Sequence, residues 1–278
     1  MPELPEVETV ARGLSQVMVG RTFTGVTVRW PRTIARPAVD QFARRIVGRQ
    51  VLAVGRRGKY VRMTLDEGYL LIHLKMSGRL RVASADQVPD KHVHTVFDLD
   101  NGEQLWFRDV RKFGRVYLVD QPEEVTGALG PEPLEDAFTL ADFRTRLSRR
   151  SGRLKSLLLN QEFLAGLGNI YADEALFAAG LHPLRRADTL SPDEEARLYG
   201  AIRSVLRDAV AGRGTTLDDG GYRDAAGEPG AYQDRIFVYG RGGETCYRCQ
   251  GVIERIVIGG RSSHFCPCCQ PAELANNV

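Results

Sequence analysis

Apolar residues along the chain change their spacing near residue 20, from a helical period to a strand period. Between residues 5 and 19 they recur at i, i+3, i+4 and i+7, which places them on one face of a helix. Pro5 suits the first turn of that helix, and Gly20 suits its end. The pattern predicts a helix over residues 5–19, with an apolar face made of Val7, Val10, Ala11 and Leu14.

From Thr22 to about Val119 the chain consists of β-branched and aromatic runs separated by turn signals. The strongest signal is Asp-Asn-Gly at residues 100–102, because an Asn-Gly pair favours the tight turn of a β-hairpin. A second turn is predicted at residues 66–68. We therefore expect a mainly antiparallel sheet domain, most simply a β-sandwich.

The second half of the chain opens on a stretch rich in proline and glycine, residues 121–136, which predicts a linker. Capping-box patterns at Thr139 and Ser191 predict several helices over residues 139–211. Residues 212–230 are rich in glycine and lack periodicity, which predicts a mobile loop. The predicted organisation is α+β: a helix plus sandwich over 1–120, the linker, a helical domain over 137–235 and a short β tail over 236–278.

Length and composition are those of an ordinary globular protein. The chain has 278 residues, 43% hydrophobic and 26% charged, which argues against disorder, collagen-like repeats and coiled coils. No uncharged apolar run approaches the roughly 18 residues that a membrane span needs. The start, Met-Pro-Glu-Leu-Pro-Glu, lacks the basic and apolar regions of a signal peptide, so we expect a protein of the cytoplasm with no membrane partner.

Basic residues are concentrated in two stretches. Residues 29–62 hold ten lysines and arginines against one acid, Asp40, and residues 143–161 hold six against none. Either stretch alone is equally well explained as a solvated face. Together they favour a polyanion as partner, because each phosphate that is neutralised releases condensed counterions.

Four of the five cysteines form two close pairs, Cys246 with Cys249 and Cys266 with Cys269, separated by sixteen residues. Two C-x2-C pairs at this spacing are typical of a zinc site made of four thiolates. Such a site has no open coordination position, so the zinc is structural and stabilises a segment too short for its own core. Disulfides are the alternative, but nothing in the sequence indicates an oxidising compartment. Cys268, inside the second pair, is expected to be a bystander.

The residues between the two cysteine pairs predict a β-hairpin. A run rich in valine and isoleucine, residues 252–258, is followed by two glycines at 259–260 and by a second run over residues 261–265. Arg261 therefore lies at the tip of the hairpin. A zinc hairpin with a basic tip is typical of proteins that contact nucleic acid, and it does not by itself imply catalysis.

The start of the chain offers an unusual nucleophile. Taken alone, residues 1–6 are only the entry into a helix. If Met1 is removed, as is usual before a small second residue, Pro2 presents a secondary amine with a pKa of about 8, partly free at neutral pH. Such an amine can attack a sugar carbon and form an iminium, whose positive charge cannot be lost by deprotonation. That property suits it to elimination chemistry.

Six motifs, in the same order, resemble those of the bacterial formamidopyrimidine-DNA glycosylases, a family that repairs 8-oxoguanine. The resemblance extends from residue 2 to residue 269, and the set is specific although each motif alone is weak. The motifs are Met-Pro-Glu-Leu-Pro-Glu-Val-Glu-Thr at 1–9, Lys59, His-Leu-Lys-Met-Ser-Gly at 73–78, Arg-Lys-Phe-Gly at 111–114, Gly-Leu-Gly-Asn-Ile-Tyr-Ala at 166–172 and the zinc hairpin.

This resemblance implies a bifunctional DNA glycosylase and abasic-site lyase with one structural zinc. It implies that an oxidised purine opposite cytosine in duplex DNA is flipped out and excised through a Schiff base, followed by β,δ-elimination. It also implies a helix-two-turns-helix element, a monomer and a place near the bacterial nucleoid. The matching catalytic positions are Pro2 for the nucleophile, Glu3 for the acid that assists ring opening, Lys59 for β-elimination and Arg261 for δ-elimination.

Nine further residues match positions at which the family contacts DNA or orders the site. Met76, Arg111 and Phe113 match the trio that fills the gap left by the flipped nucleotide. From the sequence alone, Met76 and Phe113 are more typical of a core, and the glycines at 166 and 168 of a tight turn between helices. The remaining matches are Glu6, which is expected to order the site, and the phosphate or backbone contacts His73, His92, Arg150, Lys155 and Asn169.

The match weakens after Leu217, where relatives commonly place an aromatic residue close behind an acid. Here Asp-Asp-Gly-Gly at 218–221 precedes Tyr222, so this loop departs from the pattern of the family. We expect oxidised purines, because Met76, Arg111 and Phe113 resemble the purine-specific branch rather than endonuclease VIII.

Two other functions are open at this point. A protein that binds damaged or bent DNA without chemistry would use the zinc hairpin and the basic stretches, but it would have no use for an amine at Pro2. A zinc-ribbon RNA-binding or transcription factor would explain the tail, but it would leave the first 120 residues unused.

Overall fold

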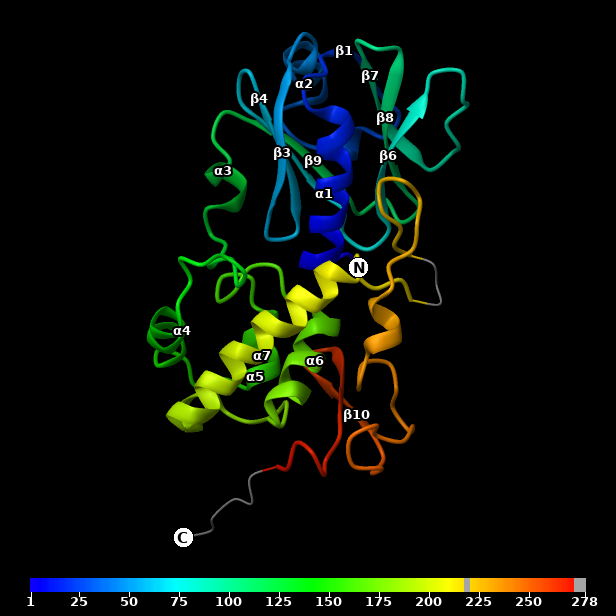
Figure 1. The fold of residues 1–278 in the computed structure, drawn as a ribbon. Coiled ribbons are helices and arrows are strands. Elements are labelled where there is room, and N and C mark those ends of the chain that lie inside the picture. Colours follow the sequence, from blue (N-terminus) through cyan, green and yellow to red (C-terminus); the bar gives the residue numbers. More distant parts are fainter. Residues whose placement is uncertain (218–220, 273–278) are drawn as a thin grey trace. The chain divides into compact units, whose positions relative to one another are not determined.

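The computed structural model describes residues 1–217 and 221–272 and divides the chain into two compact units. We call them the sheet unit, residues 1–128 with 210–233, and the helical unit, residues 129–209 with the chain from residue 234 onward (Figure 1). The first boundary lies inside the predicted linker. No helix among the described residues is both long and apolar enough to cross a membrane.

The sheet unit is a sandwich of two β-sheets, as predicted. One sheet has four strands in the order β1-β7-β8-β6 and is antiparallel throughout. The other has five strands in the order β2-β9-β5-β4-β3, and only its β2–β9 pair is parallel. The strands are β1 (Phe23–Val28), β2 (Ile34–Arg36), β3 (Val51–Arg57), β4 (Tyr60–Leu65), β5 (Tyr69–His73), β6 (Gly78–Ser84), β7 (Val93–Leu99), β8 (Glu103–Asp109) and β9 (Arg115–Val119).

Both predicted turns connect neighbouring strands: residues 66–68 join β4 to β5, and residues 100–102 join β7 to β8. Gly102 has a φ of 80°, the left-handed conformation that glycine adopts without steric cost. The core between the sheets draws apolar side chains from both, among them Phe97 and Phe107 from one sheet and Met63 and Ile72 from the other.

The predicted first helix is α1 (Leu4–Met18), which packs along β3 and β4 of the five-stranded sheet. All four residues of its predicted apolar face are buried. A second helix, α2 (Val39–Ile46), lies within the stretch for which only strands were expected. Its eight residues bury only Phe42 and Ile46, so the apolar signal was too short to separate it from the strands around it. A short helix, α3 (Glu123–Thr126), follows β9.

The chain from residue 210 to residue 233 belongs to the sheet unit, whereas the sequence placed it in the helical domain. Its described residues are tied to α1: Tyr222 lies in the core of the sandwich, and the Ala225 side chain approaches Gly13. A Cβ on Gly13 would lie 3.1 Å from that side chain. Residues 218–220 of the predicted mobile loop lie outside the described part of the chain.

The helical unit contains α4 (Leu140–Leu147), α5 (Leu154–Leu159), α6 (Asn169–Ala179) and most of α7 (Pro192–Ala211). The last two residues of α7 belong to the sheet unit. Both predicted capping boxes are confirmed: the Asp142 N–H donates to the Thr139 hydroxyl, and the Glu194 N–H donates to the Ser191 hydroxyl. The two turns between α5 and α6 complete the helix-two-turns-helix element. A hairpin of β10 (Glu254–Ile258) and β11 (Arg261–Phe265) packs on α6.

Removal of the Phe97 ring is expected to destabilise the sheet unit strongly. The ring is fully buried, with its centroid 5.4 Å from that of Phe23 and 6.1 Å from that of Phe42. Phe97→Ala should lower the free energy of unfolding by about 3–5 kcal/mol, because a cavity remains. Tryptophan fluorescence in urea checks this, since the chain's two tryptophans, Trp30 and Trp106, both lie in this unit. Val88→Ala, at a side chain 87% exposed, is the control.

Candidate active site and metal centre

The first residues of the chain are buried in the sheet unit. Met1 is 40% exposed, but Pro2 is buried and Glu3 is 2% exposed. A capping box closes the start of α1: Glu6 Oε2 accepts the Glu3 N–H at 2.8 Å, and the Glu3 side chain accepts the Glu6 N–H. This pair satisfies two of the N–H groups that the first turn of a helix leaves without intrahelical partners.

Glu6 also holds the segment that follows α7. Its Oε1 accepts the Thr215 N–H at 2.7 Å, so one buried carboxylate joins the chain start to a residue 209 positions away. The approach is tight, since a Cβ on Gly214 would lie 2.7 Å from Glu6 Oε1, and Gly214 has a φ of 79°. Glu6 was expected to order the site, and its hydrogen bonds to two separate segments fit that role.

Lys59 lies in the turn between β3 and β4 and is 6% exposed. The hairpin that carries it is fixed to α1 by an ion pair between Arg56 and Glu8, whose Nε and Oε2 are 2.9 Å apart. Burial alone would raise the pKa of Glu8, but Arg56 and Arg12 together lower it. The start of α1 and the predicted β-elimination lysine are thus carried by elements that pack together.

His73, at the end of β5, is held as a neutral imidazole. Burial, reinforced by the positive charges of Lys75 and Lys59, lowers its pKa to about 3. Its Nδ1 accepts the Lys75 N–H at 2.9 Å, so the ring proton resides on Nε2. The Tyr60 ring packs edge-on against it, with centroids 4.6 Å apart. His73 can therefore donate one hydrogen bond but carries no charge near neutral pH.

The three predicted gap-filling residues lie at the surface of the sheet unit. Met76 is 39% exposed, Phe113 is 48% exposed, and Arg111 is exposed. The Arg111 guanidinium lies 5.0 Å from the centroid of the Phe113 ring, within cation–π range. From the sequence alone, Met76 and Phe113 were more typical of a buried core, and that expectation is wrong.

In the helical unit, Asn169 is the first residue of α6. Its Nδ2 donates to the Ser262 carbonyl at 2.9 Å, while its buried Oδ1 has no hydrogen-bond partner among the residues that the structure describes. Lys155 is fully buried and donates both to the Asn169 carbonyl, at 2.9 Å, and to Asp173 Oδ1, at 2.7 Å. A direct phosphate contact by Lys155 does not fit this placement, because its ammonium faces α6 rather than solvent.

The remaining predicted residues are more accessible. Arg150 and Arg261 are exposed, and His92 is half-buried. Arg261 opens β11 and is paired with Ile258 across a two-residue turn, so it lies at the hairpin tip as expected. Both turn residues have positive φ, 56° at Gly259 and 75° at Gly260, which is the conformation of the tight turn that best matches strand twist.

The four paired cysteines form a compact metal centre in the helical unit. The Sγ atoms of Cys246, Cys249, Cys266 and Cys269 all lie within 4.8 Å of one another, with Cys249 and Cys266 3.4 Å apart and Cys246 and Cys269 3.9 Å apart. Tetrahedral zinc with bonds of about 2.3 Å requires sulfur atoms about 3.8 Å apart, so the cluster fits one zinc ion. Cys268 is exposed and lies outside the cluster.

Two acids of α6 that the sequence reading missed hold the segments around the metal centre. Asp173 accepts the Ser263 hydroxyl at 2.7 Å and the His264 N–H at 2.9 Å. Glu174 accepts three consecutive backbone N–H groups, those of residues 237–239, each at 2.9 Å. A signal was present, since two adjacent acids in an otherwise apolar helix are rarely buried without partners.

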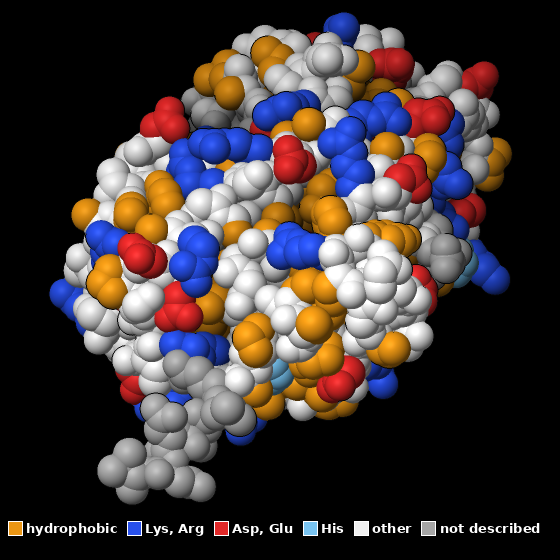
Figure 2. All heavy atoms as spheres, turned by 60° about the horizontal axis from the view of Figure 1, so that its bottom comes forward, with side chains coloured by type: hydrophobic (Ala, Val, Ile, Leu, Met, Phe, Trp, Pro, Cys, Tyr) orange, Lys and Arg blue, Asp and Glu red, His pale blue; other side chains and the backbone are white. Residues whose placement is uncertain are grey.

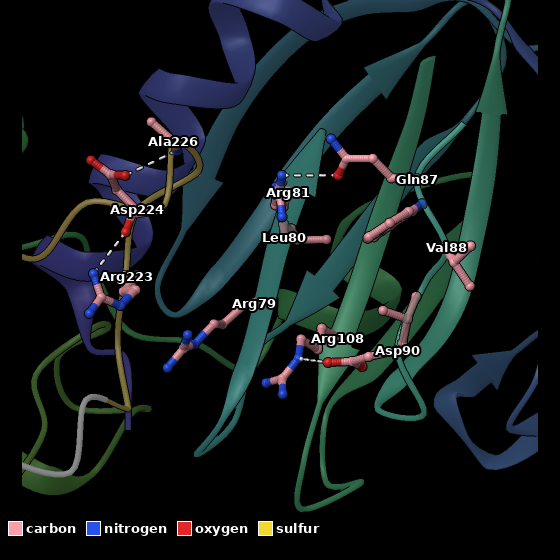
Figure 3. A pocket seen from close by; sticks show the side chains of 13 residues that line it. Arg79, Leu80, Arg81, Gln87, Val88, Asp90, Arg108, Arg223, Asp224 and Ala226 are labelled. Carbon is pink, nitrogen blue, oxygen red and sulfur yellow. Dashed lines mark hydrogen bonds and ion pairs between the residues drawn. The ribbon is translucent and has the colours of Figure 1, made fainter. Parts of the chain in front are cut away.

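A cavity of about 500 Å³ lies on the outer face of the four-stranded sheet. Arg79 and Arg81 of β6 and Arg108 of β8 point into it, with Arg223 and Asp224 on the opposite wall (Figure 3). None of the predicted site residues lines it. This cavity is therefore separate from the predicted site.

Lysine and arginine side chains lie at many places on the face shown in Figure 2, with single acidic residues between them. Exposed positive charge of this kind suits the polyanion partner that the two basic stretches predicted.

Taken together, these features define a protein with a four-cysteine metal centre and a sheet unit that contains a buried N-terminal segment, a buried lysine and a neutral histidine. Three family models match the chain: the formamidopyrimidine-DNA glycosylase N-terminal domain over residues 1–116, the H2TH domain of the same glycosylase over 129–219, and a zinc finger found in FPG and IleRS over 243–272. The chain therefore belongs to the formamidopyrimidine-DNA glycosylase family.

Individual relatives match over nearly the whole length. The formamidopyrimidine-DNA glycosylase of Herpetosiphon aurantiacus is 50% identical over 97% of this chain and 100% of its own, and that of Bacillus subtilis is 43% identical over 97% and 99%. The crystal structure of the MutM (FPG) protein from Thermus thermophilus has a TM-score of 0.88 at 42% identity, covering 97% of this chain and 98% of that one. A Lactococcus lactis FPG mutant in complex with Fapy-dG-containing DNA has a TM-score of 0.91 at 34% identity, covering 98% and 100%.

The neutral state of His73 predicts an acid-sensitive sheet unit. In the unfolded chain the imidazole takes up a proton below about pH 6.5, whereas in the folded unit it does so only near pH 3. The stability is therefore complete above pH 6.5 and falls as the pH drops toward 3, by at most about 1.4 kcal/mol per pH unit from this group. His73→Gln should flatten the curve measured by tryptophan fluorescence in urea. His92→Gln is the control, and an equal flattening there would contradict the assignment.

Removal of zinc is expected to disorganise the hairpin while the sheet unit stays folded. All four ligands lie in the helical unit, whereas both tryptophans lie in the sheet unit. Chelation should therefore weaken binding to damaged duplex DNA, measured by fluorescence anisotropy, before it shifts the tryptophan unfolding curve. Normal DNA binding by protein shown to be zinc-free would contradict this. Cys268→Ser should leave both readings unchanged.

Proposed function

We propose that this chain is a bifunctional DNA glycosylase and abasic-site lyase that excises oxidised purines, such as 8-oxoguanine and formamidopyrimidines, from duplex DNA. The observation that carries the proposal is the burial of Pro2 at the start of α1, beside carboxylates that fix the local backbone. A protein that only binds DNA has no need to bury its chain start in this way. Membership of the family and the DNA complexes of its relatives support the same conclusion.

Removal of Met1 leaves Pro2 with a secondary amine. The nitrogen lone pair attacks the anomeric carbon of the damaged nucleotide, the bond from that carbon to the base breaks, and the base leaves with the proton that the amine nitrogen loses. Glu3, 2% exposed, is placed to donate and recover protons as the sugar ring opens. The product is an iminium between Pro2 and the sugar, which withdraws electrons from the adjacent carbon–hydrogen bond.

Two basic residues serve the eliminations that follow. Lys59 supports β-elimination from the β3–β4 turn, and Arg261 supports δ-elimination from the hairpin tip. Both also carry a charge that stabilises the departing phosphates. The positive charge of each residue is needed both for proton transfer and for stabilising the phosphate. Substitution of Lys59 or Arg261 is therefore expected to reduce strand cleavage more than base release.

The other residues bind and open the duplex. Met76, Arg111 and Phe113 enter the gap left by the flipped nucleotide, with Arg111 facing the orphaned cytosine. His73 donates from Nε2 to a phosphate without adding charge. The backbone contacts fall to His92, Arg150 and the start of α6 at Asn169.

Lys155 acts indirectly in this proposal. Its ammonium holds the Asn169 carbonyl and Asp173, so it fixes the start of α6 for a ligand rather than contacting the ligand itself. The zinc ion likewise supplies folding energy to the hairpin and takes no part in the chemistry.

We further propose that the chain acts as a monomer, in the cytoplasm and at the nucleoid, where its duplex substrate is found. We keep the domain limits that were predicted from the sequence, with one change: residues 210–233 are assigned to the sheet unit. Thr215 of this stretch donates to Glu6, which ties the stretch to the chain start.

Borohydride trapping tests the proposed chemistry. Wild-type protein, with Met1 shown by mass spectrometry to be absent, should form a covalent adduct with a duplex that contains 8-oxoguanine opposite cytosine. Pro2→Gly should reduce the adduct by at least about 100-fold, the order that loss of a nucleophile costs, and an N-terminal tag should block it. Val88→Ala is the control. Correctly processed wild type that forms no adduct would favour a binder without chemistry.

A further inference from the structure

Two neighbouring loops of the sheet unit carry the gap-filling residues. Residues 74–77 join β5 to β6 and include Met76, whereas residues 110–114 join β8 to β9 and include Arg111 and Phe113. These loops are distant in sequence, but β6 pairs with β8, with Gly78 opposite Asp109 at the end of the ladder. Whatever fixes the two loops to each other therefore determines how the trio is presented.

Asp109 is the residue that fixes them. It is 1% exposed, and its Oδ1 accepts both the Ser77 hydroxyl from one loop and the Arg111 N–H, at 3.1 Å, from the other. Its Oδ2 accepts the Gly114 N–H at 2.7 Å. The Arg111 N–H is shared with the Ser77 hydroxyl, also at 3.1 Å, which closes a ring of hydrogen bonds between the loops.

The backbone of Asp109 is held from the opposite side. His94, 4% exposed, places Nε2 2.7 Å from the Asp109 carbonyl, and since a carbonyl only accepts, Nε2 carries the proton. The Asp109 N–H donates to the His92 carbonyl at 2.8 Å. The carboxylate is therefore anchored in β7 and β8 and cannot follow a loop that moves.

Close packing restricts the loops further. A Cβ on Gly114 would lie 2.3 Å from the Phe107 ring, and one on Gly78 would lie 2.9 Å from the same ring and 2.4 Å from the Leu74 carbonyl. Phe107 itself is fully buried. Both loops thus pack closely against one buried ring, and neither Gly78 nor Gly114 has room for a side chain.

Each loop also contains one residue in a strained conformation. Lys75 has a φ of 53° and Lys112 a φ of 60°, in the left-handed region that residues with a Cβ seldom adopt. Lys75 precedes Met76, and Lys112 lies between Arg111 and Phe113. Such strain persists only where the surroundings over-determine the backbone, and it is concentrated at functional positions.

We propose that Asp109 is a positioning residue that locks the two loops into one preformed wedge, so that Met76, Arg111 and Phe113 are in place before the damaged nucleotide leaves the stack. The inference rests on the proposed function and deepens it. A preformed wedge avoids the cost of ordering three side chains at the moment of insertion. Asp109 acts through these residues and does not touch the reacting atoms.

Asp109→Asn is the decisive variant. An amide keeps the size of the side chain but replaces one acceptor oxygen with an NH2 group, so it cannot accept at both Oδ positions. Ser77→Ala removes the hydroxyl that donates to Asp109. Ser77→Thr keeps that hydroxyl and should behave like wild type. The matched control is Asp100→Asn, at the other end of the β7–β8 hairpin, where the carboxylate accepts the Thr22 N–H at 3.1 Å.

Two substrates separate positioning from chemistry. Single-turnover excision of 8-oxoguanine opposite cytosine requires the wedge, whereas borohydride trapping at an abasic site in single-stranded DNA has no stack to open. Asp109→Asn should lower excision at least tenfold and leave trapping within twofold, with Ser77→Ala intermediate. Asp100→Asn should stay within twofold in both. Fluorescence of 2-aminopurine opposite a tetrahydrofuran abasic analogue, which reports unstacking on binding, should rise less with Asp109→Asn than with wild type.

Three results would overturn the inference. Wild-type excision and fluorescence in Asp109→Asn would show that the carboxylate does not position the wedge. An equal fall in excision and trapping, accompanied by a lower unfolding temperature, would show that Asp109 only stabilises the fold. Equal behaviour of Ser77→Thr and Ser77→Ala would exclude the shared hydroxyl. If wild type forms no adduct on either substrate, the proposed chemistry fails, but the fluorescence reading still decides whether Asp109 positions the loops.

Discussion

The candidate site in the sheet unit depends on two hydrogen bonds that the Glu6 carboxylate accepts. A chain terminus is ordinarily exposed and poorly ordered unless something ties it down. Here one buried carboxylate accepts the N–H of Glu3 and the N–H of Thr215. Because both acceptor oxygens are used, neither the chain start nor residues 214–215 can shift without leaving a buried charge partly unsatisfied, which is far more costly than losing an ordinary hydrogen bond.

The same constraint explains local features that carry no chemistry of their own. Gly214 must lack a side chain, since a Cβ would meet the Glu6 carboxylate. Tyr222 fills the sandwich core and donates its hydroxyl to the Arg213 carbonyl at 3.1 Å. Burial, together with the nearby Glu6 charge, raises the pKa of Tyr222 and keeps the phenol neutral. The segment after α7 is therefore an integral part of the wall around the chain start.

The sequence predicted elements whose signal is local and failed where the deciding contact is long-range. The face of α1, the turn at residues 100–102 and the zinc cysteines are each encoded within a few residues, and the structure confirms all of them. The assignment of residues 210–233 to the sheet unit depends on contacts with α1 across about 200 positions. Glycine-rich composition could not reveal those contacts, because it reports only local backbone freedom.

The same division holds for the candidate site. Resemblance selected Met76, Phe113 and Lys155, but it could not say how each side chain is presented. Residue type alone favours burial for methionine and phenylalanine and exposure for lysine, and the structure reverses all three. Asp109 and Asp173 were passed over for a related reason. An aspartate at a strand end or within a helix has many uses, and only the donors gathered around it show that it organises its surroundings.

The metal centre and α6 divide the work of fixing the hairpin. Successive side chains on a helix point about 100° apart, so the adjacent acids Asp173 and Glu174 reach two different segments. Asp173 accepts from β11, and Glu174 accepts from residues 237–239. Burial raises the pKa of Glu174, and the three backbone N–H groups oppose that rise by favouring the charged form.

Zinc can fix only the residues around its four thiolates, and those lie beyond the ends of the hairpin strands. The register that carries Arg261 therefore needs a second anchor, which α6 provides through Asp173 and through the contact of Asn169 with the Ser262 carbonyl. Since Asn169 also begins α6, the hairpin tip and the helix start are fixed by the same few bonds. The start of α6 and Arg261, both proposed above to contact DNA, are thus set in register by the fold of the helical unit itself.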